Sequence, residues 1–142
     1  MASQLFDAGR EGFLLGEIDW DGGVIKTTLV RGYTFNAAHR FVSDVQNAGG
    51  SLVATSSALT AKSGIGGVAD AADLTFPAVV TGAAIPAAIY FQSSAVTGGA
   101  DVAPTQQRLI CYIDSGTGLP VVPNGQAVNW AHDNGANRIF KL

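Results

Sequence analysis

The sequence has 142 residues, a length that suits one domain whose hydrophobic core needs no disulfide or metal to stabilise it. Its net charge of −3 and its eight scattered basic residues exclude the basic surface on which DNA- and RNA-binding proteins depend. Apolar residues make up 47% of the chain and charged residues only 13%. We therefore expect partner chains to cover part of the surface, with an alanine-rich, weakly charged monomer as the alternative.

The first six residues are predicted to form an N-terminal arm. Leu5 and Phe6 are apolar, are flanked by polar residues and belong to no longer periodic element. We therefore interpret this arm, extended to residues 2–10, as an attachment element.

A short helix is expected over residues 8–15. Asp7 is placed to cap its beginning, and Gly16 is placed to end it. Phe13 and Leu14 are predicted to pack this helix on the sheet.

The first long strand is predicted at Val24–Arg31, where apolar and polar residues alternate. Ile25 and Leu29 would face the core, and Lys26 and Thr28 would face solvent. Such alternation is typical of a half-buried antiparallel strand.

Residues 32–43 show no clean period and are expected to form an ordered excursion with one helical turn at most. The aromatic residues Tyr33, Phe35 and Phe41 occur in it. Two interpretations stay open: the rings pack beneath the core, or they form an exposed patch for a partner chain.

Further strands are predicted downstream, separated by turns rich in glycine and asparagine. Pro86 indicates an edge position or a bulge, residues 115–118 form a turn, and Asp133-Asn134-Gly135 predicts a hairpin. The expected strands are Leu52–Thr60, Leu74–Val80, Ala83–Phe91, Arg108–Asp114, Ala127–Ala131 and Asn137–Leu142. The pattern predicts an all-β fold over residues 1–142, a single-domain antiparallel β-sandwich or jelly-roll-like barrel with one short N-terminal helix.

The strand that begins at Arg108 is the centre of this prediction, because both of its faces are apolar. Leu109, Cys111 and Ile113 would point to one side, and Ile110 and Tyr112 to the other. A strand of this kind is covered from both sides. In so small a chain, we expect the second cover to come from another subunit.

The sequence offers no recognisable reaction centre. The two histidines, His39 and His132, share no motif with each other or with Cys111, and metal sites need ligands at close spacing. Glu11 and Glu17 are the only glutamates. We expect no enzyme activity, no cofactor and no metal.

The expected compartment follows from three observations. The single cysteine excludes an internal disulfide, the first residues show no secretory signal, and no apolar run is long enough to span a membrane. We therefore expect the protein to fold in a reducing cytoplasm, without a membrane partner.

Three segments carry a resemblance to a known family. They are G-E-I-D-W at Gly16–Trp20, Y-I-D-x-x-T-G-L-P-V at Tyr112–Val121 and D-N-G-A-N-R-I-F-K-L at the end of the chain. In this order they make the sequence, from about Gly9 to Leu142, resemble small virion structural proteins of tailed bacteriophages. The loop Ser93–Thr105 and Pro86 depart from the family pattern.

The resemblance implies a non-enzymatic head decoration (cement) protein on the capsid surface. Such a protein binds the major capsid protein, stabilises the head and associates with itself, here as a homotrimer. The residues that we expect to contact the capsid or a second subunit are Gln4, Leu5, Phe6, Arg10, Tyr33 and Phe35.

Two alternatives stay open. The first is a component of the tail, baseplate or fibre. The second is a carbohydrate- or receptor-binding module, which would need exposed aromatic rings. Trp20 and Trp130 are the candidates, although Trp130 lies in a strand pattern that favours the core.

Overall fold

A five-stranded antiparallel sheet organises the chain in the computed structural model, which describes residues 2–116 and 118–142. The strands lie in the order β1-β7-β6-β2-β3, so that β1 and β3 form the two edges. Their bounds are Ala2–Leu5 for β1, Val24–Arg31 for β2, Ser51–Thr55 for β3, Ala87–Ser94 for β6 and Arg108–Ser115 for β7. The strand predicted at Val24–Arg31 is confirmed, and the one predicted from Arg108 ends one residue later than expected.

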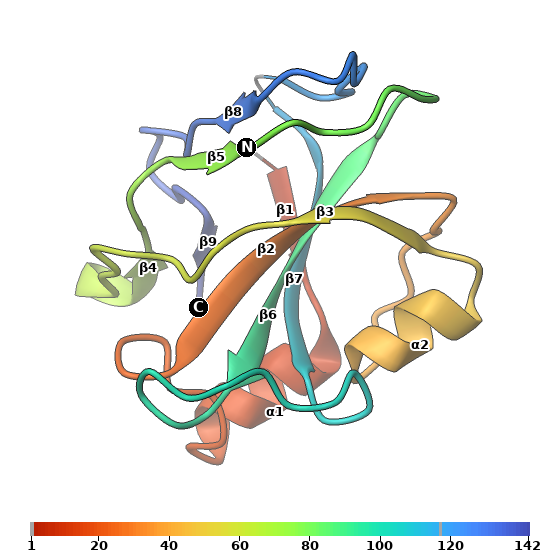
Figure 1. The fold of residues 1–142 in the computed structure, drawn as a ribbon. Coiled ribbons are helices and arrows are strands. Elements are labelled where there is room, and N and C mark those ends of the chain that lie inside the picture. The colour runs from red at the N-terminus through yellow and green to blue at the C-terminus, as the bar shows by residue number, and fades with distance from the viewer. Residues whose placement is uncertain (1, 117) are drawn as a thin grey trace.

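Smaller elements complete the domain. Two short antiparallel ladders, β4–β9 and β5–β8, lie to the left of the central strands in Figure 1, and α2 lies to the right. The bounds are Val68–Ala69 for β4, Leu74–Phe76 for β5, Val128–Trp130 for β8, Phe140–Lys141 for β9, Asp7–Leu14 for α1, Val42–Asn47 for α2 and Ile65–Gly67 for the 3₁₀ turn η1. The predicted all-β class is confirmed, and a sandwich-like single domain describes it.

The central sheet is buried on both faces by residues of the same chain. One hydrophobic cluster joins the sheet to the two small ladders through residues such as Tyr90, Trp130 and Phe140. The other joins it to α2 and the segment before α2 through Phe6 and Val45. Every residue of β6 is buried, and Leu109, Ile110, Cys111, Tyr112 and Ile113 on β7 are at most 6% exposed. The prediction that a second subunit covers these strands is therefore wrong.

The two faces of β7 are not divided as the alternation predicts. Leu109 belongs to the same cluster as Tyr112, whereas Ile110 belongs with Cys111 and Ile113. The register explains the difference, because Tyr90 lies opposite Cys111 while Phe91 lies opposite Leu109. One extra residue on β7 forms a bulge, and a bulge reverses the face to which the preceding residue points.

The face of β2 that was expected to meet solvent is largely buried, and only Lys26 on it is half-exposed, where it pairs with Asp101 at 2.8 Å. Thr28, which was expected to face solvent, is fully buried, and its hydroxyl donates to the carbonyl oxygen of Ala54 at 3.2 Å. A strand in the middle of a sheet that is covered on both sides has no solvent face, so alternation alone was misleading here.

Helix α1 packs on β7 at very close range. A Cβ atom on Gly9 would lie 2.6 Å from the carbonyl oxygen of Ile110, so glycine is required for this approach. The helix ends at Leu14, one residue earlier than predicted, and Gly16 follows it in the expected left-handed conformation, with φ +71°. The predicted cap is wrong, because Phe6 is the N-cap and Asp7 is already the first helical residue. Phe13 packs against Phe140 at 5.8 Å between ring centroids. Leu14 is 86% exposed, so the prediction that it packs on the sheet is wrong.

Helix α2 is longer than the single turn expected within residues 32–43 and begins near the end of that segment. Its beginning is fixed by the Asp44 carboxylate, which accepts hydrogen bonds from the amides of Arg40 at 2.8 Å and Phe41 at 2.9 Å. The Phe41 amide bond is the main reason that the pKa of Asp44 lies below its ordinary value. Val42 and Val45 anchor the helix in the core.

Several predicted boundaries need correction. The strand expected at Leu74–Val80 is β5, which ends earlier than predicted, at Phe76. The strand expected at Ala83–Phe91 is β6, which begins later, at Ala87, and extends to Ser94. Pro86 precedes β6, where it costs no ladder hydrogen bond. The hairpin predicted at residues 133–135 is wrong, because β8 pairs with β5 and β9 pairs with β4. Thr117, in the predicted turn 115–118, lies outside the described residues.

The predicted N-terminal arm is an edge strand of the sheet. Strand β1 pairs with β7, with Gln4 opposite Tyr112 and Leu5 opposite Cys111. Phe6 is fully buried. A segment this short carries no periodicity, so only its long-range pairing reveals it as a strand. Met1, the first residue of the predicted arm, lies outside the described residues.

Candidate functional site

The outer edge of β1 is a candidate docking edge. The amide of Phe6 donates to the carbonyl oxygen of Ile110 at 3.0 Å, so the backbone groups of Phe6 and Gln4 face β7. In an antiparallel pair, the backbone groups of the intervening residues point the other way. The amide and carbonyl groups of Ser3 and Leu5 therefore face outward.

One of these outward groups already has a partner. The Leu5 carbonyl oxygen accepts a hydrogen bond from the Arg10 guanidinium at 3.1 Å. Within residues 2–116 and 118–142, no hydrogen bond from another element reaches the Ser3 amide, the Ser3 carbonyl or the Leu5 amide. The edge thus offers two donors and one acceptor for a further strand.

This edge lies in a hollow of about 530 Å³. Phe35 packs with the cluster on one face of the sheet, and Phe140, which precedes Lys141, belongs to the cluster on the other. The hollow therefore has the edge of β1 as its floor and walls that arise from both faces. Its lining residues are Ser3, Gln4, Leu5, Arg10, Phe35, Ala37, Asn137 and Lys141.

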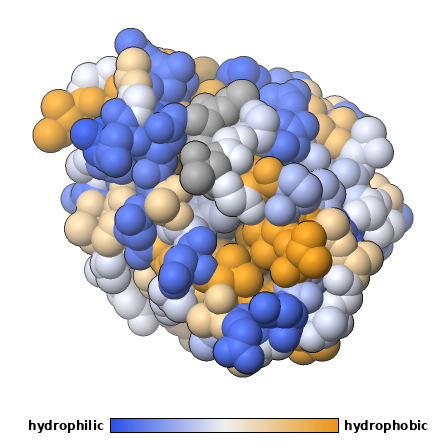
Figure 2. Space-filling view, turned by 90° about the horizontal axis from the view of Figure 1, so that it is seen from above, coloured by the Kyte–Doolittle hydropathy of each residue, from blue (hydrophilic) through white to orange (hydrophobic). Residues whose placement is uncertain are grey.

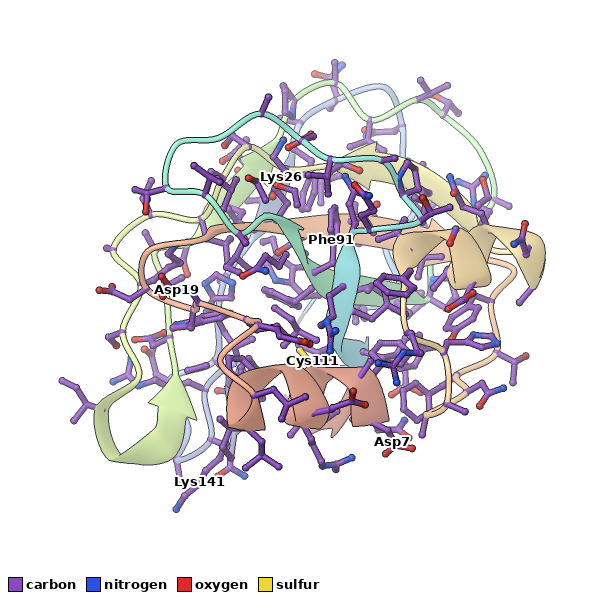
Figure 3. The ribbon with its side chains drawn as sticks, turned by 90° about the horizontal axis from the view of Figure 1, so that it is seen from below. Asp7, Asp19, Lys26, Phe91, Cys111 and Lys141 are labelled. Carbon is purple, nitrogen blue, oxygen red and sulfur yellow. The ribbon has the colours of Figure 1, made fainter. Side chains whose placement is uncertain are left out.

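A second, more apolar hollow adjoins the first. It has a volume of about 430 Å³ and shares Leu5, Arg10 and Lys141 with its neighbour. Phe13, Leu14 and Leu142 complete its lining. Figure 3 shows this side of the molecule, with Asp7 at one end of α1 and Lys141 extending into solvent near the other. We call the two hollows together the β1 groove.

The β1 groove is basic, although the whole chain carries a net charge of −3. Arg10 and Lys141 line both hollows, and neither lining set contains an acidic side chain. Arg10 pairs with Asp7 at 3.4 Å, but both side chains are exposed, and such pairs are weak. Lys141 forms no ion pair within the part of the chain that the structure describes.

Four of the six residues predicted to make contacts line this groove: Gln4, Leu5, Arg10 and Phe35. The other two are buried and do not line it. Phe6 is fully buried and packs against Phe35, with 5.0 Å between ring centroids. Tyr33 is 7% exposed, and its hydroxyl forms a hydrogen bond of 2.8 Å with Nδ1 of His39. Phe6 therefore packs behind Phe35 of the groove, Tyr33 packs on Tyr112, and neither can be an exposed contact.

The far wall of the groove could not be predicted from the sequence. Asn137 and Lys141 reach β1 only because β9 pairs with β4 and lies beside β1. These contacts join opposite ends of the chain, and no local pattern encodes them.

The tryptophans proposed for a carbohydrate platform are in the core. Trp20 is 9% exposed, and its indole N–H donates to the carbonyl oxygen of Ser63 at 2.9 Å. Trp130 is 1% exposed, as its strand pattern predicted, and donates to the Tyr90 hydroxyl at 2.8 Å. A sugar-stacking platform built on these two rings is therefore excluded.

His132 belongs to the same buried polar cluster. Its Nε2 lies 2.9 Å from the Tyr90 hydroxyl, and its Nδ1 lies 3.0 Å from the carbonyl oxygen of Ala71. Burial lowers the pKa of His132 and raises the pKa of Tyr90, so both groups are neutral. Burial likewise raises the pKa of the Cys111 thiol. These groups stabilise the core and are inaccessible to a substrate.

Three further findings concern the described residues. They contain no cluster of three or more histidine, cysteine, aspartate or glutamate side chains that could hold a metal ion. Among them, no helix has the length and apolar character to cross a membrane. Comparisons with protein-family models, with curated proteins and with solved structures found no match for this chain.

Proposed function

We propose that this protein is a non-enzymatic head decoration protein of a tailed bacteriophage, which binds the major capsid protein and stabilises the head. The observation that carries the proposal is the β1 groove, where an open sheet edge meets four of the six residues expected to make contacts. The family resemblance of the three sequence segments supplies the class of partner.

The rest of the structure is consistent with a domain that folds on its own and attaches to its partner through a small contact area. Both faces of the central sheet are closed by the chain itself, so the domain is able to fold before it binds. On a shell, many copies bind a repeated surface, and each copy that bridges two neighbouring subunits gains from effective concentration. Modest contacts at the β1 groove are therefore sufficient.

Self-association as a homotrimer is part of the proposal, but it rests now on the resemblance alone. The apolar strands that were expected to need a second subunit are covered by their own chain. Exposed apolar side chains remain at the end of the domain that carries β5 and β8, where Val80 and Val122 are 76% and 72% exposed. Figure 2 looks onto this end, where an apolar patch lies among polar residues.

Sedimentation with purified shells tests the function. Shells assembled from the phage's own major capsid protein are mixed with the protein, pelleted and analysed for bound copies. The proposal expects saturation at a copy number in proportion to the capsid subunits. A protein that stays in the supernatant, or that is found only on tails at a few copies per virion, would refute the head assignment and favour the tail component.

A further inference from the structure

We propose that the β1 groove binds an extended acidic segment of the partner protein, which adds to the central sheet as a strand beside β1. The inference rests on the proposed function only for the identity of that partner, the capsid protein. The chemistry of the bound segment follows from the groove itself.

The backbone of β1 supplies the first part of the argument. Ser3 and Leu5 present outward groups that no other element of the described chain engages, and the Leu5 carbonyl alone is occupied by Arg10. Unpaired edge groups are a template for a further strand. Strand addition of this kind gives affinity through main-chain hydrogen bonds and specificity through side-chain pockets.

The walls of the groove favour one strand and disfavour a second sheet. Phe35 and Ala37 lie on one side of the edge, and Asn137 and Lys141 on the other. A single extended chain lies within such walls, with alternate side chains directed at each of them. Both walls would obstruct a second sheet that approached the edge of β1.

Charge decides the chemistry of the segment. Arg10 and Lys141 lie where the two hollows meet, and no acidic side chain lines either hollow. A carboxylate on the bound strand would satisfy both basic groups. A second copy of this chain, paired through its own β1, would instead bring Arg10 and Lys141 against their counterparts, and like charges in opposition are unfavourable.

The second hollow adds an apolar requirement. Leu14 is 86% exposed and Leu142 is 59% exposed, and both line the hollow with Leu5 and Phe13. A large apolar side chain of the partner would cover them. The expected segment therefore has a carboxylate and a large apolar residue close together in an extended, β-forming sequence.

A matched pair of substitutions at one position tests the backbone contact. Ser3→Pro removes the outward amide, which takes no part in the ladder with β7, whereas Ser3→Ala retains it. We expect Ser3→Pro to weaken shell binding by about tenfold or more and Ser3→Ala to leave it unchanged. Equal binding by the two variants, both folded by circular dichroism, would overturn the strand addition.

A second pair tests the charge contact. Lys141→Gln removes one positive charge from the groove, and Gln46→Glu makes the same change in net charge on the exposed face of α2. Because exposed ion pairs are weak, we expect Lys141→Gln to reduce affinity about two- to fivefold and Gln46→Glu to have no effect. A similar loss in both variants would show a nonspecific charge effect and contradict the acidic segment.

The isolated protein provides a test that does not depend on the phage assignment. A display library of random peptides is selected on wild-type protein, after removal of peptides that also bind the Ser3→Pro variant. Enrichment of acidic, apolar peptides is expected. In NMR exchange experiments with a selected peptide, the amides of Ser3 and Leu5 should gain protection, while those of Gln4 and Phe6 should change little.

The two proposals can fail separately. If the protein saturates shells but Ser3→Pro binds as well as Ser3→Ala, the function stands and the strand addition fails. If the protein does not bind shells but selects acidic peptides that protect the Ser3 and Leu5 amides, the groove assignment stands and the assignment of the capsid protein as its partner fails. Selection of basic or random peptides would overturn the groove chemistry.

Discussion

The Tyr90 hydroxyl oxygen lies 2.9 Å from Nε2 of His132, and both side chains are buried in the main core. The hydroxyl also accepts a hydrogen bond from the indole N–H of Trp130 at 2.8 Å, so its own proton is directed to His132. His132 must then carry its proton on Nδ1, where it donates to the carbonyl oxygen of Ala71. The chain of donors fixes the neutral tautomer of His132 and ties β6 to the segment around β8.

Removal of the Tyr90 hydroxyl should therefore be costly. Tyr90→Phe leaves a buried donor on Trp130 and a buried acceptor on His132 without a partner, so the free energy of unfolding should fall by about 1–3 kcal/mol. Tyr112→Phe is the matched control, because no hydrogen bond to the Tyr112 hydroxyl is formed within the described chain. Urea unfolding measures both, and equal losses would contradict the network.

Stability should fall in mild acid because of His132. Burial holds its pKa below the ordinary value of 6.5 in the folded protein. Below pH 6.5 the unfolded chain binds a proton that the folded chain does not bind, so stability is lost as the pH falls from 6.5 toward the lowered value. Unfolding free energies at pH ~7.5 and ~5.5 should differ in wild type, by at most about 1.4 kcal/mol per pH unit. A slope that persists in His132→Gln would assign the effect to other groups.

The contact between α1 and β7 predicts an unusual response to alanine. In an open helix Gly→Ala stabilises by about 1 kcal/mol, but at Gly9 the new Cβ would lie 2.6 Å from the Ile110 carbonyl oxygen. We expect Gly9→Ala to destabilise the fold by about 1–3 kcal/mol in thermal or urea unfolding. Gly64→Ala, whose Cβ would meet nothing within 4 Å, should change stability by less than about 0.5 kcal/mol. A stabilising Gly9→Ala would show that α1 does not pack this closely.

Cys111 gives a direct test of how firmly the central sheet is closed. Its side chain is fully buried and burial raises its thiol pKa, so reaction with a thiol reagent requires the core to open. Labelling in native buffer should be slow, should accelerate with urea in step with unfolding, and should reach one thiol per chain. Rapid labelling of the native protein would mean that β7 is accessible.

The long, strongly patterned strands could be predicted from the sequence. Val24–Arg31 and the strand from Arg108 are recognisable because their composition alone favours strands. The predictions that failed concern what lies against them. Apolar character on both faces of β7 correctly indicated two covers, but sequence could not show that α1, α2 and the small ladders of the same chain supply them.

The candidate site could be predicted only in part. Gln4, Leu5 and Arg10 were chosen because the N-terminal segment carries unexplained apolar residues, and they do line the groove. Its other wall depends on Lys141, which lies beside β1 in the fold although it is at the opposite end of the sequence. Phe6 was assigned to the surface for the same reason as Leu5, yet the alternation of β1 buries it on the opposite face.

This burial also changes how attachment should be tested. Deletion of residues 1–6 would remove an edge strand and the fully buried Phe6, so lost binding could reflect lost folding. Substitutions at Ser3 separate the two, because its backbone groups face away from β7.

A cryo-electron microscopy reconstruction of shells saturated with the protein would show directly which surface of the domain meets the capsid. We predict that the outer edge of β1 faces the capsid and that a strand of capsid density runs beside Ser3 and Leu5, within reach of Arg10 and Lys141. Attachment through the opposite edge strand β3, or through the loops that carry Val80 and Val122 with the β1 groove open to solvent, would show that β1 is not the docking edge.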